Sequence, residues 1–117
     1  MKEVGGYVFD FPRYKVFLEA KAEALRSDGM EVRFHCGPAD SPKQGMILEL
    51  VWEGMYGGFE NWITGETDYT VMPVGKHGQP LAYRWGLIVT DESFAAIFDE
   101  FLAAFRSFAV VQSRSRA

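Results

Sequence analysis

Between residues 30 and 89 the chain repeats short segments in which apolar and polar residues alternate. Alternation with a period of two is typical of strands that bury one face. Because short connections join successive strands, the sequence predicts an antiparallel meander of about five strands. The segments are Met30–Cys36, Met46–Glu53, Phe59–Thr64, Thr67–Val74 and Leu81–Val89.

Two helical patterns flank these segments. Asp10, as an N-cap, and Pro12, in the first turn, predict the start of the first helix, and Gly29 predicts its end. Thr90 or Asp91 caps the second helix, whose apolar residues then recur every three or four positions: Phe94, Ile97, Phe98, Phe101, Leu102 and Phe105. Each helix has one apolar stripe, so the sequence predicts a two-layer α+β sandwich with both helices on the same side of the sheet. Residues 1–110 are expected to form one domain, followed by a disordered tail over residues 111–117.

Glycine and proline positions predict the turns. Gly54 to Gly58 is expected to be a turn that carries an exposed aromatic tip, Tyr56. A second turn is expected near Gly65, and Pro73 should lie in an edge strand or end its strand. In the last strand segment the alternation is cleanest, and its large apolar residues, Trp85 among them, are expected in the core with Trp52.

The charge distribution limits the classes of partner. The 117-residue chain has a net charge of −4 and a pI of about 5.1, which argues against nucleic-acid binding. Residues 31–70 hold seven acids and two bases. The single cysteine, Cys36, favours a reducing compartment, and no segment resembles a signal peptide or a membrane span. We therefore expect a cytoplasmic protein that does not bind membranes.

No residue pattern in the sequence predicts catalysis. His35 and Cys36 are adjacent in a predicted strand, so their side chains should point to opposite faces. His77 lies in a glycine-rich loop with no carboxylate close in sequence, and it is more simply explained as an exposed turn residue. Glu49 and Glu53 could be paired acids for hydrolysis, but they share the outward face of one strand, where acids usually form only a solvated surface. We expect no catalytic residue, no metal site and no cofactor, and hence no enzyme.

What remains is a pattern of acids and aromatic residues in the middle strands. The acids Glu49, Glu53, Glu60, Glu66 and Asp68 come from consecutive strands and turns, with Tyr56, Trp62 and Tyr69 between them. Aromatic anchors in a charged surround are typical of protein-binding surfaces, and a negative one suits a basic partner. An alternative is that the acids only keep the outer face soluble. The predicted partner contacts are Glu53, Tyr56, Glu60, Trp62, Glu66 and Asp68.

Three tryptophan-containing stretches carry a resemblance to a known family. Glu49–Glu53, Gly58–Trp62 and Tyr83–Gly86 place Trp52, Trp62 and Trp85 in the strand meander. In this respect the chain resembles the immunity proteins of bacterial polymorphic-toxin systems, and among them the three-tryptophan type called TriTu. The resemblance implies a small protein that binds a cognate toxin, here a basic toxin domain, and blocks its active site or its access to substrate.

Two other functions stay open at this point. Chaperones of secreted effectors are also small, acidic α+β proteins, and they usually dimerise through exposed apolar surface. A small enzyme or ligand-binding domain would use His77 with Cys36 or a carboxylate, in a concave pocket. The sequence leaves both a monomer and a homodimer open.

Overall fold

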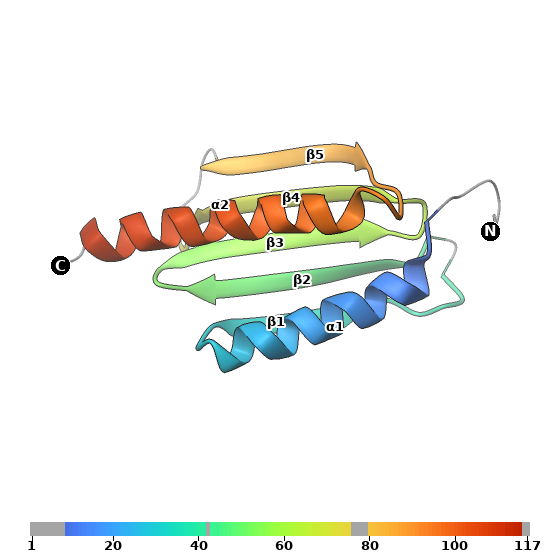
Figure 1. The fold of residues 1–117 in the computed structure, drawn as a ribbon, viewed down its shortest axis with the longest axis horizontal. Helices are drawn as coiled ribbons and strands as arrows, with labels where there is room; N and C mark the ends of the chain where they lie inside the picture. Colours follow the sequence, from blue (N-terminus) through green and yellow to red (C-terminus); the bar gives the residue numbers. More distant parts are fainter. Residues whose placement is uncertain (1–8, 42, 76–79, 116–117) are drawn as a thin grey trace.

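The computed structural model describes residues 9–41, 43–75 and 80–115, with side chains up to residue 109. Within these residues the chain forms one antiparallel sheet flanked by two helices, and the predicted α+β class is confirmed (Figure 1). His77 lies outside the described residues.

Five strands form the sheet in the order in which they occur along the chain. Each strand pairs antiparallel with the next, which confirms the predicted meander. β4 ends at Pro73, as the missing donor of proline requires. The strands are β1 (Glu31–Cys36), β2 (Gly45–Trp52), β3 (Met55–Trp62), β4 (Glu66–Pro73) and β5 (Ala82–Ile88).

Both helices cover the same face of the sheet (Figure 1). α1 (Phe11–Ser27) lies over β1 and β2, and α2 (Phe94–Ser115) lies over β3 and β4. The side chain of Asp10 accepts a hydrogen bond from the Arg13 backbone N–H at 3.2 Å, so Asp10 caps α1 as expected. α2 extends to Ser115, whereas the sequence led us to expect a disordered tail from residue 111.

Aromatic rings form the centre of the core between the two layers. Phe59 of β3 lies 5.2 Å from Phe98 and 5.4 Å from Phe101 of α2, measured between ring centroids. Phe17 of α1 lies 5.7 Å from Phe98, so the two helices also contact each other. Phe17, Phe98 and Phe101 belong to the apolar stripes predicted for the helices, and their packing with Phe59 joins sheet and helices into one core.

The predicted turn from Gly54 to Gly58 is wrong. The turn is confined to Glu53 and Gly54, both with positive φ (52° and 77°), and β3 begins at Met55. A Cβ atom at Gly57 would lie 2.8 Å from Phe105 and 3.1 Å from Phe101. Gly57 is therefore a strand residue that lets α2 approach the sheet closely. The close approach, and not a turn, is the reason why this position requires glycine.

The prediction that Trp85 belongs to the core is also wrong. The ladder between β4 and β5 shifts register between Thr67 and Tyr69, and opposite this shift Gly86 adopts a φ of 71°. The Gly86 backbone N–H donates to the Asp68 carboxylate at 2.6 Å. Such a bulge breaks the alternation, so Trp85 before it and Leu87 after it point to opposite faces of the sheet. Trp85 therefore lies on the face away from the helices and is 58% exposed.

The packing of α2 on Gly57 generates a first prediction. We expect Gly57→Ala to lower the free energy of unfolding by about 1–3 kcal/mol, because the added methyl group overlaps two fully buried rings. Urea unfolding followed by circular dichroism measures the change. Gly37→Ala is the matched control, because a Cβ there meets only ordinary contacts at 3.5 Å. Equal stabilities of the two variants would contradict the proposed role of Gly57.

Candidate functional site

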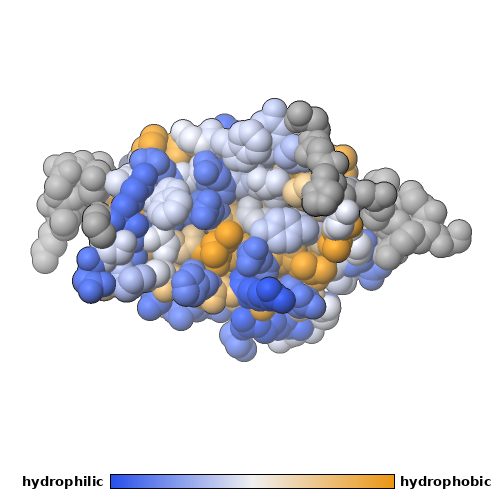
Figure 2. All heavy atoms as spheres, turned by 180° about the vertical axis from the view of Figure 1, so that it is seen from behind, coloured by the Kyte–Doolittle hydropathy of each residue, from blue (hydrophilic) through white to orange (hydrophobic). Residues whose placement is uncertain are grey.

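The face of the sheet opposite the helices is not covered by any described helix, and we call it the open face (Figure 2). Alternation along the paired strands defines its residues. Hydrophobic and hydrophilic side chains are interspersed over it (Figure 2). Its side chains are Glu31, Arg33, His35, Ile47, Glu49, Val51, Tyr56, Glu60, Trp62, Glu66, Asp68, Thr70, Met72, Tyr83, Trp85 and Ile88.

Tyr56 lies across the middle of the open face. Its hydroxyl donates to the Glu49 carboxylate at 2.7 Å, and a Cβ at Gly58 would lie 2.8 Å from that hydroxyl. Gly58 thus leaves the space that the ring fills. Burial of the hydroxyl and its hydrogen bond to Glu49 raise the pKa of Tyr56 well above its usual range, so the hydroxyl remains a donor at physiological pH.

Two hollows flank the Tyr56 ring. One, of about 170 Å³, is lined by Glu31, Arg33, Glu49, Val51 and Tyr56. The other, of about 200 Å³, is lined by Ile47, Tyr56, Gly58, Glu60, Asp68 and Thr70. Each hollow therefore combines an aromatic wall with at least one carboxylate.

Glu60 and Asp68 are directly opposite each other on β3 and β4. Burial, with Asp68 and then Glu49 as nearby like charges, raises the pKa of Glu60 above its usual value of 4.5. Among the described residues no lysine or arginine forms an ion pair with Glu49, Glu60 or Asp68. Arg33 is opposite Glu49 in the register but is not within ion-pair distance of it. The charges of these three carboxylates are therefore not neutralised within the described chain.

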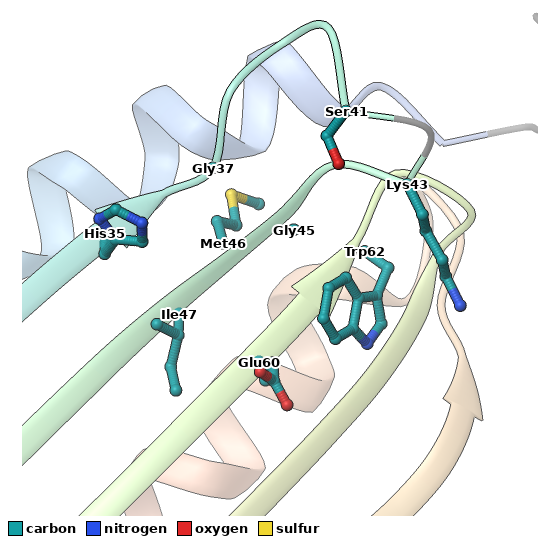
Figure 3. Close-up of a pocket in the computed structure, with 9 residues that line it drawn as sticks. All are labelled: His35, Gly37, Ser41, Lys43, Gly45, Met46, Ile47, Glu60 and Trp62. Atoms are coloured by element: carbon teal, nitrogen blue, oxygen red, sulfur yellow. The ribbon is translucent and has the colours of Figure 1, made fainter.

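Trp62 lines a third hollow, of about 270 Å³, together with Glu60 and His35 (Figure 3). The indole ring lies over Gly45, where a Cβ would overlap it. The Lys43 ammonium lies 5.4 Å from the centroid of the ring and 2.8 Å from the Glu66 carboxylate. The hydrogen bond from Lys43 holds the pKa of Glu66 below its usual value. The charge of Glu66 is thus paired with a cation within the described chain.

Five of the six predicted contact residues lie together on the open face: Tyr56, Glu60, Trp62, Glu66 and Asp68. Glu53 lies apart from them, in the turn between β2 and β3. The predicted partner contacts did not include Ile47, Thr70, Tyr83 and Trp85, which also lie on the face. The alternation in β2 and β4 already implied the positions of Ile47 and Thr70, whereas Tyr83 and Trp85 depend on the bulge at Gly86.

Tyr69 does not belong to the acidic face, contrary to the sequence interpretation. It is buried on the helix side, against Phe101, and its hydroxyl donates to Glu100 of α2. Burial and this hydrogen bond raise the pKa of Tyr69 to about 12. Glu100 also pairs with Arg84 at 2.8 Å, so these three residues tie β4 and β5 to α2.

His35 and Cys36 do not come together in the structure, and His77, the other candidate, lies outside the described residues. His35 is exposed on the open face, whereas Cys36 packs against the core on the other face, as alternation predicted. No group of three or more His, Cys, Asp and Glu side chains within the described ranges is arranged to hold a metal ion. No helix in the described part of the chain is long and apolar enough to cross a membrane.

Comparisons of the chain with protein-family models, with curated proteins and with solved structures found no match. The geometry of the open face is therefore the basis for a functional interpretation.

The like-charge environment of Glu60 generates a prediction about stability. We expect Glu60→Gln to raise the free energy of unfolding at pH 7 by up to about 1 kcal/mol, after allowance for solvent screening. Because the folded-state pKa of Glu60 is raised, the native charge destabilises the fold above that pKa and has no effect once the group is protonated in both states. The gain should therefore vanish as the pH falls below 4.5.

Glu66→Gln is the matched control on the same face. The folded-state pKa of Glu66 is lowered, so its charge stabilises the fold above its usual pKa, and its removal should lower stability at pH 7. Thermal unfolding of both variants between pH 3 and pH 8 tests the pair. Shifts of the same sign at pH 7 would show that the charge environments of Glu60 and Glu66 do not differ as described.

Proposed function

We propose that the protein is a non-catalytic binding domain whose open face takes a basic protein partner. The observation that carries the proposal is the group formed by Glu49, Glu60 and Asp68, three carboxylates not paired with a cation in the described chain, around the Tyr56 ring. With Lys43 at its rim, the open face holds five acids and two bases, a net charge of −3.

The electrostatics of this group favour binding of a cation. Ionised Glu60 is opposed by two like charges in the free protein, and an arginine or lysine from a partner would relieve that repulsion. Across an interface, a desolvated carboxylate that meets a guanidinium forms short, charge-assisted hydrogen bonds. The cross-strand position of Glu60 and Asp68 places two acceptors side by side, which suits the planar fork of an arginine.

The aromatic residues of the face supply the apolar part of such an interface. Tyr56 and Trp62 are both half-buried, and glycines beneath them hold each ring close to the sheet. Rings held in this way lose little conformational freedom on binding, which is why Trp and Tyr dominate interface hot spots. Acids around two ordered rings therefore support a protein partner better than a small metabolite.

The resemblance to toxin-immunity proteins supplies the class of partner. A toxin domain that acts on nucleic acid needs a basic active site to attract phosphate, and an acidic face complements that site. In this proposal the open face covers the toxin's active site or its substrate channel. Inhibition by occlusion requires no catalytic residue in the inhibitor.

The proposal predicts that charge reversal on the open face abolishes protection. The double variant Glu60→Lys/Asp68→Lys should lose protection of cells that express the cognate toxin domain. The expected loss of affinity is at least ~100-fold, because two favourable charge contacts become repulsive. Growth of the cells and titration of the purified toxin domain measure the two effects, and circular dichroism verifies that the variant is folded.

Glu19→Lys on α1 is the control, because Glu19 is exposed on the opposite side of the molecule. It changes the net charge in the same direction and should leave protection intact. The affinity of the parent should also fall steeply with added salt, and that of the double variant should not. Protection by the double variant equal to that of the parent would remove the open face as the binding surface.

A further inference from the structure

The exposed large hydrophobic side chains of the described chain are concentrated at one edge of the molecule. Five of the six lie in β5 or in the connection that leads to it, and the sixth is Val16 of α1. Trp85 is 58% exposed and Ile88 is 66% exposed. The five are Val74, Leu81, Tyr83, Trp85 and Ile88.

β5 is also an edge strand that the helices leave uncovered. Among the described strands it pairs only with β4, so the backbone groups on its other side have no ladder partner. α2 lies over β3 and β4, and β5 extends beyond it (Figure 1). The side chains of β5 are accordingly exposed or half-buried along its whole length.

The opposite edge of the sheet is protected in several ways. α1 runs alongside β1, and its Arg26 guanidinium donates to the backbone carbonyl of Val32 at 3.3 Å. The outward side chains of β1 are Glu31, Arg33 and His35, which are polar or charged and oppose pairing with another strand. The contrast between the two edges indicates that the bare, apolar β5 edge is an interaction surface.

We infer that β5 pairs antiparallel with β5 of a second copy of the chain, so that two sheets join into one of ten strands. A second copy fits this edge better than the basic partner of the open face does. Arg84 is the only charged residue of β5, and it is already paired with Glu100. β5 itself therefore carries no unpaired charge and no carboxylate of its own, so two copies of net charge −4 can pair their backbones there, with Glu66 and Asp68 one strand away from the seam.

Symmetry determines how the two open faces would lie. Two antiparallel copies of one strand are related by a twofold axis perpendicular to the sheet, which keeps equivalent faces on the same side. Both open faces would then point in one direction, on either side of a seam formed by Tyr83 and Trp85, whose rings lie 4.4 Å apart within one chain. The dimer leaves the proposed partner-binding residues Glu60 and Asp68 accessible.

Sedimentation velocity of the full chain over a dilution series tests the inference. We expect a monomer–dimer equilibrium, and we expect Trp85→Lys/Ile88→Lys to raise the dimer dissociation constant at least ~10-fold. Both residues are more than half exposed, so this variant should keep its fold and, at dilutions where both chains are monomeric, the melting temperature of the parent. Val16→Lys, which removes the exposed hydrophobic residue far from β5, should dimerise like the parent.

Hydrogen exchange at the same concentrations identifies the paired edge. Those backbone amides of residues 82–88 that are not bonded to β4 or to Asp68 should gain protection in the dimer and lose it on dilution, while the amides of β1 should not change. A parent chain that stays monomeric at every soluble concentration would overturn the inference. A dimer whose protection lies elsewhere, or one that Val16→Lys also dissociates, would overturn it equally. None of these outcomes depends on whether the open face binds a toxin.

Discussion

The close packing of α2 against β3 is the constraint on which the rest of the structure depends. Phe101 and Phe105 can reach the sheet because Gly57 has no side chain, and Phe59 then contacts three rings of α2. Since the apolar stripes of both helices are satisfied on one face, nothing in the described chain remains to cover the other. The open face exists because both helices cover the same face of the sheet. A five-stranded sheet in this arrangement presents every second residue of its strands to solvent.

Much of this fold could be predicted from local patterns. The alternation in β2 correctly placed Met46, Leu48 and Leu50 in the core, and the spacing of phenylalanines in α2 correctly identified its buried stripe. Glycines were harder to interpret. A glycine that ends a strand and one that makes room for a helix look identical in sequence, because the ring that needs the room at Gly57 comes from residues more than forty positions later. The bulge at Gly86 was hidden for a similar reason, since it depends on a hydrogen bond to Asp68 of another strand.

The gathering of acids could be predicted because outward positions of consecutive strands align in a meander. Glu49, Glu60 and Asp68 share the face for this reason. The position of Tyr69 was predictable by the same rule, since it is adjacent to Asp68 and must point the other way. The pairing of Glu66 with Lys43 was not predictable, because Lys43 comes from the irregular connection between β1 and β2. Sequence thus indicates which carboxylates share a face, whereas the loops decide which of them are neutralised.

The open face and the β5 edge differ in charge, and this difference separates their proposed roles. Glu49, Glu60 and Asp68 already repel one another within one chain, so two open faces would repel each other if they came into contact. Self-association is therefore favoured at β5, which carries no carboxylate of its own. The open face and the β5 edge nevertheless adjoin at Thr70, which is opposite Tyr83 in the ladder and accepts a hydrogen bond from the Trp85 indole. In a dimer joined at β5, the two acidic faces would lie on the same side of the joined sheet. Their carboxylates would repel each other, and salt would limit the range of this repulsion to about the Debye length. A basic partner that neutralises either face would weaken that repulsion. Since coupling between two binding equilibria is reciprocal, dimerisation would in turn strengthen the hold on the partner.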